Sequence, residues 1–390
     1  MFVSLQRPVE EKTEPAPPPV SPFRSFMAGG FECACQKRAD GVRLDLLSQT
    51  GHAPWARNDY AGLAALGIRV VRDGVRWHLV EKAAGVYDWS SVAHMAETAA
   101  EIGVQVIWDL CHYGWPDHVD VWSPSFREQF ADFAANFAQM LRRETGASGA
   151  YCAINEISFL AWAGGETGRM NPFAVERGPE LKRALAGAAI AATRAVRSID
   201  PAALFISAEP LIHVAPAGDP AADAYRLAQY EAIDMILGRR EPELGGGPGL
   251  IDVIGVNYYP DNQWYIGGAT IPMGHHAYRP LADLLREVHE RYGKPIFVSE
   301  TGAEGRARSH WLHHVVEEVA LALREGTPVS GICLYPIVDY PGWENGRLCE
   351  VGLFGPADDR GQRPVYEPFL AEIRRAQSMF DVASSEPMAL

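Results

Sequence analysis

Polar residues end several short apolar runs of the sequence, and two of these residues are glutamates. Glu156 ends the run 149–156, and Glu300 ends the run 295–300. Two carboxyl groups that face each other suit cleavage of a glycosidic bond, because one protonates the departing oxygen while the other attacks or stabilises the cationic carbon. A single carboxylate at a strand end can also serve a structural ion pair. Other apolar runs end in further polar residues, namely Arg72 with Asp73, Asp109 with His112, Glu209, and Asn257 with Tyr258 and Tyr259.

The apolar runs alternate with longer segments of helical period, as expected of βα units. Apolar residues at three- and four-residue spacing predict helices at 124–145 and 308–325. No GxGxxG loop follows the first run, so a single α/β (β/α)8 TIM barrel is favoured over a doubly wound sheet. The C-terminal ends of the strands then line one mouth, where the active site is expected. The eight predicted strands are 26–34, 68–74, 104–112, 149–156, 203–209, 251–259, 295–300 and 329–337.

Composition limits the partners and the domain organisation. The chain has 390 residues, a formal net charge of −14 and no basic run, which argues against nucleic-acid and membrane partners. Six cysteines without a CxxC pair argue against a disulfide framework, and the default expectation is a cytoplasmic protein. We expect a disordered proline-rich tail at 1–21, a catalytic barrel at 22–377 and a C-terminal tail at 378–390.

Several segments resemble glycoside hydrolase family 1 of clan A, the β-glucosidase and β-galactosidase type. The stretch 149–156 is similar to the family's TFNEP segment, with Asn155 and Glu156 in place, and 295–302 is similar to its ITENG segment, with Glu300 in place. The resemblance covers about residues 26–355. It extends to Gln36 in a first-strand glutamine motif, Arg72 and Trp77 in RxxxxW, His112 and Pro116 in HWDLP, Asn257 to Tyr259 in NYY, and Asp339 and Trp343 in WSLLDNFEW.

The resemblance implies a retaining β-glycosidase that works by double displacement through a covalent glycosyl-enzyme, without a cofactor or a metal. Glu300 would be the nucleophile and Glu156 the acid and base. Arg72 and Tyr259 would keep Glu300 ionised, and Asn155 would donate to the sugar 2-hydroxyl. The residues implied to bind the glycone are Gln36, His112, Trp343, Tyr335 and Asn257, and an aromatic platform for the aglycone would draw on Trp115, Trp122, Trp162, Tyr113 and Trp264.

The sequence departs from the family at several of these positions. Ile157 replaces the proline after the acid, Thr301 replaces the asparagine after the nucleophile, and Tyr335 replaces the eighth-strand tryptophan. Gly342 stands where the family has the glutamate that grips the outer hydroxyls of the glycone. Neighbouring Glu344 or Glu350 are candidate substitutes, and the preferred sugar stays open.

Three other functions use parts of the same pattern. A transglycosylase would use the same residues and transfer the sugar to another hydroxyl. A carbohydrate-binding barrel without turnover would not need both glutamates. A metal-dependent hydrolase would need three or four ligands at the strand ends, where His112 is the one histidine. The expected partner is a small glycoside or oligosaccharide, and the sequence does not indicate an oligomeric state.

Overall fold

The structure is a computed structural model that describes residues 21–385, with side chains through Phe380, so the expected tail at 1–21 lies almost wholly outside it. Nine strands form one parallel sheet in the order β7-β6-β5-β2-β1-β13-β12-β10-β8. Each of the eight predicted strands is present, and all but the strand predicted at 295–300 are shorter than expected. The strand predicted at 203–209 is divided into β7 and β8. The strand bounds are β1 Met27–Gly30, β2 Val70–Gly74, β5 Gln105–Asp109, β6 Ala150–Cys152, β7 Leu204–Ile206, β8 Glu209–Pro210, β10 Ile254–Asn257, β12 Ile296–Thr301 and β13 Val329–Leu334.

The first and last strands of this order, β7 and β8, are consecutive along the chain, and this closes the sheet into a barrel. Only Ser207 and Ala208 separate β7 from β8, and Ile206 forms a parallel bridge with Val253 just before β10. The predicted strand 203–209 is therefore interrupted. At the break the carbonyl oxygen of Ser207 lies only 1.8 Å from where a Cβ of residue 255 would stand, so the position requires glycine.

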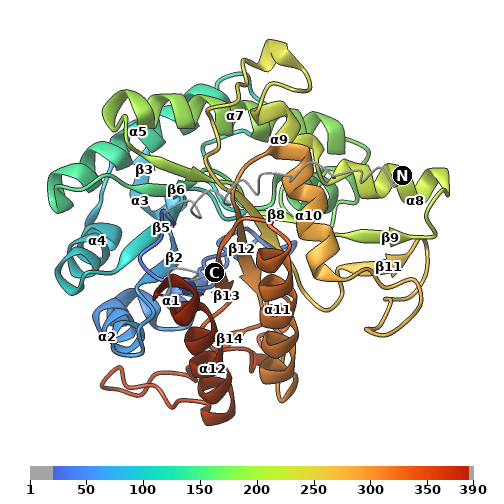
Figure 1. Ribbon diagram of the computed structural model, residues 1–390. Coiled ribbons are helices and arrows are strands. Elements are labelled where there is room, and N and C mark those ends of the chain that lie inside the picture. Colours follow the sequence, from blue (N-terminus) through green and yellow to red (C-terminus); the bar gives the residue numbers. More distant parts are fainter. Residues whose placement is uncertain (1–20, 386–390) are drawn as a thin grey trace, which may run out of the picture.

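Helices surround the strands in a ring, seen along the barrel in Figure 1. The predicted helices 124–145 and 308–325 are confirmed as α5 Phe126–Thr145 and α11 Ala307–Arg324. The other long helices are α2 His52–Ala65, α4 Ser90–Ile102, α7 Gly178–Ile199, α10 Leu281–Tyr292 and α12 Glu367–Ser385. Short elements in the connections are α1 Leu46–Gln49, α3 Trp77–Val80, β3 Glu81–Ala83, β4 Val86–Tyr87, α6 Ile157–Leu160, η1 Ala161–Glu166, β9 His213–Ala215, α8 Pro220–Ala228, α9 Glu231–Ile236, η2 Pro242–Leu244, β11 Gln263–Tyr265, β14 Tyr340–Pro341 and β15 Leu348–Cys349.

The last helix, α12, runs past residue 377, the expected end of the barrel, to Ser385. Its buried residues, Phe369, Ile373, Ala376 and Phe380, recur at helical spacing. Phe380 stacks on Phe26 beside β1 with 3.9 Å between ring centroids, so α12 packs on the barrel as far as Phe380.

Eight residues fill the barrel interior, each in or directly beside a different strand of the sheet. Ala28, Val70, Ile107, Ala150, Ile206, Val253, Phe297 and Cys333 form one buried cluster, as expected of a packed barrel core. Phe23, which precedes β1, packs on this cluster with its ring centroid 4.7 Å from that of Phe297. Phe23 therefore plugs the barrel interior from outside the strands.

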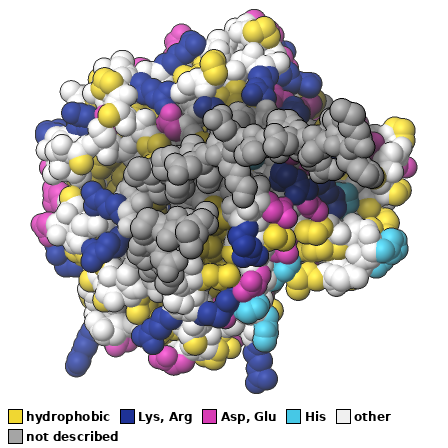
Figure 2. Space-filling view, viewed as in Figure 1, with side chains coloured by type: hydrophobic (Ala, Val, Ile, Leu, Met, Phe, Trp, Pro, Cys, Tyr) yellow, Lys and Arg dark blue, Asp and Glu magenta, His cyan; other side chains and the backbone are white. Residues whose placement is uncertain are grey.

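The surface offers no single-sign charge patch on the side shown in Figure 2, where acidic and basic side chains are interspersed. No helix within residues 21–385 is long and apolar enough to cross a bilayer.

Replacing Phe23 with Ala is expected to lower the free energy of unfolding by about 3–5 kcal/mol, because it leaves a cavity in a closed core. Urea unfolding followed by circular dichroism measures this change. Val86→Ala, at a side chain that is 58% exposed, is the control and should change little. A Phe23 variant as stable as the parent would show that the barrel core is complete without this plug.

Candidate active site

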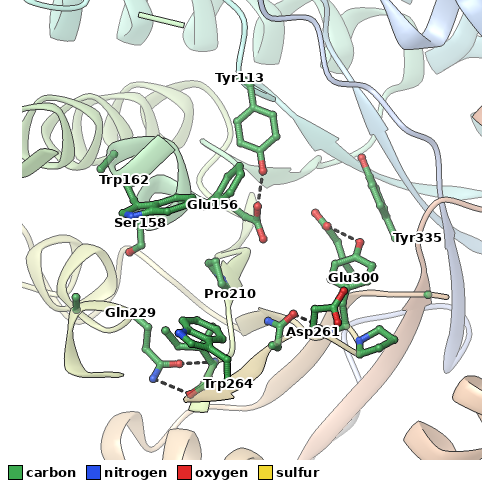
Figure 3. Close-up of a pocket in the computed structure, with 18 of the residues that line it drawn as sticks. Tyr113, Glu156, Ser158, Trp162, Pro210, Gln229, Asp261, Trp264, Glu300 and Tyr335 are labelled. Carbon is green, nitrogen blue, oxygen red and sulfur yellow. Dashed lines mark hydrogen bonds between the residues drawn. The ribbon is translucent and has the colours of Figure 1, made fainter. Parts of the chain in front are cut away.

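The C-terminal strand ends open into one cavity of about 1120 Å³. This volume exceeds the range of about 300–1,000 Å³ typical of small-molecule pockets, so it has room for more than one ring. Both predicted glutamates line it, and Figure 3 shows the carboxyl groups of Glu156 and Glu300 pointing into the same space. His112, Tyr259, Tyr335 and Trp343 line it too.

Arg72, at the middle of β2, is the charged centre beneath this cavity. Its Nε and Nη2 donate to the two oxygens of Asp109 at 2.8 and 2.7 Å, and its Nη1 donates to Glu300 Oε1 at 2.6 Å. The side chain is only 1% exposed. A buried guanidinium requires such partners, because an unpaired buried charge is costly. Burial alone would raise the pKa of Asp109, but the Arg72 charge and the His112 hydrogen bond lower it.

Glu300 is held by two donors. Arg72 binds one carboxyl oxygen, and Tyr259 Oη donates to the other, Oε2, at 2.8 Å. An adjacent cation and a hydroxyl donor both favour the ionised carboxylate. Arg72 and Tyr259, the two residues expected to support Glu300, thus both contact its carboxyl group.

Glu156 stands in a different environment. Tyr113 Oη and Asn257 Nδ2 donate to its two oxygens, the latter at 2.9 Å. Burial and then the charge of Glu300 nevertheless raise the pKa of Glu156 to about 7. Its backbone is left-handed, with φ 46° and ψ 57°, directly before α6. Non-glycine residues adopt this conformation at a cost, and such strain is concentrated at functional sites.

The two asparagines lie behind the cavity wall. Asn155 and Asn257 are both fully buried and are not among the residues that line the cavity. Asn155 Oδ1 accepts from Arg72 at 2.5 Å, while its Nδ2 donates to Tyr113 Oη at 3.0 Å and lies 3.1 Å from His112 Nε2. Its donors are thus committed to the protein rather than free for a sugar hydroxyl. Asn257 orients Glu156 and is itself fixed by Ser299 Oγ at 2.7 Å.

His112, Tyr335 and Trp343 form one end of the cavity. His112 Nδ1 donates to Asp109 Oδ2 at 2.8 Å, and its ring is parallel to that of Tyr335 with 5.9 Å between centroids. Trp343 Nε1 is buried without a hydrogen-bond partner in the described chain. A buried indole N–H normally finds an acceptor, so this end has one donor left for a ligand.

Gln36 does not line the cavity, and Glu32 does. β1 ends at Gly30, and the chain leaves the barrel so that Gln36 pairs through its backbone with Leu44. Glu32 follows the strand end directly and reaches the mouth. Neither pattern in the sequence selects Glu32, because the predicted strand 26–34 includes it and the family's motif points to Gln36.

The aromatic residues expected to form a platform divide into two groups. Tyr113, Trp162 and Trp264 line the cavity, whereas Trp115 packs on Phe126 and Trp122 lies under Arg177. In Figure 3, Trp162 and Trp264 lie on one side of Glu156, while Tyr335 lies on the other side, beyond Glu300. The cavity therefore has an aromatic arm beside Glu156 and a more polar end beside β1.

Cys33, Asp109 and His112 are the described residues whose ligand atoms lie close enough to hold a metal ion. Both oxygens of Asp109 already accept from Arg72, so a cation bound there would meet a guanidinium at hydrogen-bond distance. In this trio Asp109 therefore serves to hold Arg72 and His112 in place rather than to bind a metal ion.

No protein-family model and no curated protein sequence matches the chain. Solved structures do match. The family 1 β-glucosidase from Thermotoga maritima superposes with a TM-score of 0.71 at 14% identity, covering 91% of this chain and 97% of that one. The β-glycosidase from Thermosphaera aggregans gives 0.72 at 17% identity, covering 92% and 97%. The AHE enzyme from Alicyclobacillus herbarius gives 0.73 at 18% identity, covering 92% and 99%. At these identities the likeness shows that the chain has the (β/α)8 fold of those enzymes over nearly its whole length.

Replacing Arg72 with Met is expected to lower the free energy of unfolding by about 3–5 kcal/mol, because it leaves Asp109 and Glu300 buried without their cation. Chemical denaturation measures the change. Arg57→Met removes an exposed pair with Glu101 and should have little effect. Equal effects of the two substitutions would contradict the central position given to Arg72.

Proposed function

We propose that the protein is a retaining β-glycosidase that hydrolyses β-glycosides through a covalent glycosyl-enzyme, with Glu300 as nucleophile and Glu156 as acid and base. The observation that carries this proposal is the difference between the two glutamates. Glu300 is paired with a buried cation and a phenol, whereas burial and the charge of Glu300 raise the pKa of Glu156 to about 7. A carboxyl group that can carry a proton near neutrality, facing a second one that is paired with a cation, is what this chemistry needs.

In the first step a carboxylate oxygen of Glu300 attacks the anomeric carbon, and the bond from that carbon to the leaving oxygen breaks. Glu156 gives its proton to the leaving oxygen, so the aglycone departs as an alcohol. The aromatic arm with Trp162 and Trp264 lies beside Glu156, where the aglycone would be released. Asn155 acts through Tyr113, which contacts Glu156, rather than on the sugar.

In the second step the negative charge of Glu300 is absent, because its oxygen is bound to the sugar. The electrostatic cause that raises the pKa of Glu156 is then removed, and the deprotonated Glu156 accepts a proton from water. That water attacks the anomeric carbon from the face opposite Glu300, and the bond from this carbon to the Glu300 oxygen breaks. The carboxylate of Glu300 is released and the sugar regains its original configuration. A transglycosylase would share the first step and replace water with an acceptor hydroxyl, and product analysis with added sugar distinguishes the two.

We expect the kcat/KM for an alkyl β-glycoside to fall as the pH rises through about 7, where Glu156 loses its proton. The pH profile of kcat/KM measures this limb. A dinitrophenyl β-glycoside needs no proton on its leaving oxygen, so its profile should lack the limb. Glu156→Gln should remove the limb for the alkyl glycoside together with most of its turnover, and a limb that persists in this variant would assign it to another group.

The two roles can be separated by the products formed with azide. Glu156→Gln should still form the glycosyl-enzyme from an activated aryl β-glycoside and, with azide, should give the β-glycosyl azide by double displacement. Glu300→Gly should lose turnover of all glycosides, but azide in the vacated space should give the α-glycosyl azide. NMR of the products reads the anomers. Identical anomers from the two variants, or ordinary turnover by Glu300→Gly, would contradict the assignment.

A further inference from the structure

Besides Glu156 and Glu300, the carboxyl group of Glu32 lines the cavity at the end beside β1. Glu32 Oε1 accepts from the backbone N–H of Ala34 at 3.0 Å and lies 4.0 Å from His112 Nε2. Within the described chain, Oε2 makes no hydrogen bond. Its charge acts on Tyr335 and Tyr340, which line the same end. Glu32 thus adjoins the space where a glycone attached to Glu300 would lie.

The positions that sequence comparison offered for a glycone-binding carboxylate do not reach this space. A Cβ at Gly342 would stand 3.2 Å from Asn345 Oδ1 and 3.4 Å from Arg347 O, so a side chain there would enter the β14–β15 hairpin. Glu344 and Glu350 are exposed and do not line the cavity. Glu304 also lines the cavity but is paired with Arg347, so Glu32 is the carboxyl group that this end leaves for a sugar hydroxyl, and it follows a different strand.

Glu32 and Trp343 together offer complementary groups to hydroxyls. Oε2 of Glu32 is an acceptor without a partner, and Nε1 of Trp343 is a buried donor without a partner. The ring nitrogens of His112 already contact Asp109 and Asn155. Burial raises the pKa of Glu32, and His112 partly opposes this rise. In either protonation state a carboxyl group can accept a hydrogen bond from a sugar hydroxyl.

The cavity wall offers no free cation to a charged glycone at this end. Among the described residues that line the cavity, Lys182 is the one lysine or arginine, and it lies in α7 near the arm, bound to Glu231 Oε2 at 2.8 Å. The buried Arg72 is already bound by Asp109 and Glu300. A phosphate or carboxylate on the glycone would therefore meet Glu32 and Glu300 without a cation of its own, and an unpaired anion in a buried site is strongly disfavoured.

From this geometry, and resting on the proposed function, we propose that Glu32 determines glycone specificity by binding an outer hydroxyl of the sugar. The site then takes uncharged hexosides with free outer hydroxyls and rejects phosphorylated and uronic glycones. The selectivity comes from the first strand rather than from the loop after the eighth strand.

The experiment compares wild type, Glu32→Gln and the matched control Glu344→Gln on nitrophenyl β-glucoside or β-galactoside, whichever the wild type turns over faster. The 3-, 4- and 6-deoxy analogues and the 6-phosphate of that glycoside complete the panel. Glu32→Gln should lower kcat/KM for the parent glycoside 10- to 100-fold. On the analogue that lacks the hydroxyl bound by Glu32, the same substitution should cost less than threefold. Glu344→Gln should stay within twofold throughout, and thermal unfolding checks that both variants fold.

Equal losses by Glu32→Gln on the parent and on every deoxy analogue, or no loss at all, would overturn the role of Glu32. Wild-type turnover of the 6-phosphate comparable to that of the parent would overturn the proposed substrate class. If the wild type turns over no glycoside, the proposed function fails separately. Calorimetric binding of deoxynojirimycin then tests Glu32 alone, because Glu32→Gln should weaken binding at least tenfold, and unchanged binding would reject the inference.

Discussion

The buried positive charge of Arg72 is the constraint on which the site depends. A guanidinium with almost no solvent contact must be surrounded by acceptors, and β5, β12 and the end of β6 each supply one. These acceptors are Asp109, Glu300 and Asn155. Because they are on different strands, the charge also fixes the register of those strands at the mouth. The pairing of Gly30 with Arg72 places β1, and therefore Glu32, beside the same charge.

A continuous set of hydrogen bonds runs from one glutamate to the other. Glu300 accepts from Arg72, Arg72 donates to Asn155, Asn155 donates to Tyr113, and Tyr113 donates to Glu156. Each donor is oriented by the previous acceptor, so a change of charge at Glu300 alters the partners of Glu156 through bonds as well as through space. In the proposed reaction this is the moment at which Glu156 must change from acid to base.

The fold and the main charged residues could be predicted from the sequence because both depend on simple periodic rules. Apolar runs gave the barrel, and the polar residues that end them include Arg72, Glu156 and Glu300. The interruption of the fifth strand depends on how closely Ser207 approaches Gly255, which no local pattern records. Asn155 and Asn257 lie behind the side chains that line the cavity, whereas their motif implied contact with the sugar. Residue type alone does not reveal whether a side chain reaches the cavity or is covered by its neighbours. Gln36 and Glu32 differ by four positions, and only the path of the chain after β1 decides between them.

The left-handed backbone of Glu156 makes this position a point of conflict between folding and catalysis. Glycine adopts φ 46° without steric penalty, whereas a glutamate there costs about 1–2 kcal/mol. Selection for stability alone would replace this residue, and the substitution that relaxes the turn before α6 would remove the acid. Heat-tolerant variants obtained without an activity screen should therefore accumulate glycine at 156. Such variants would be more stable and would lack the catalytic acid.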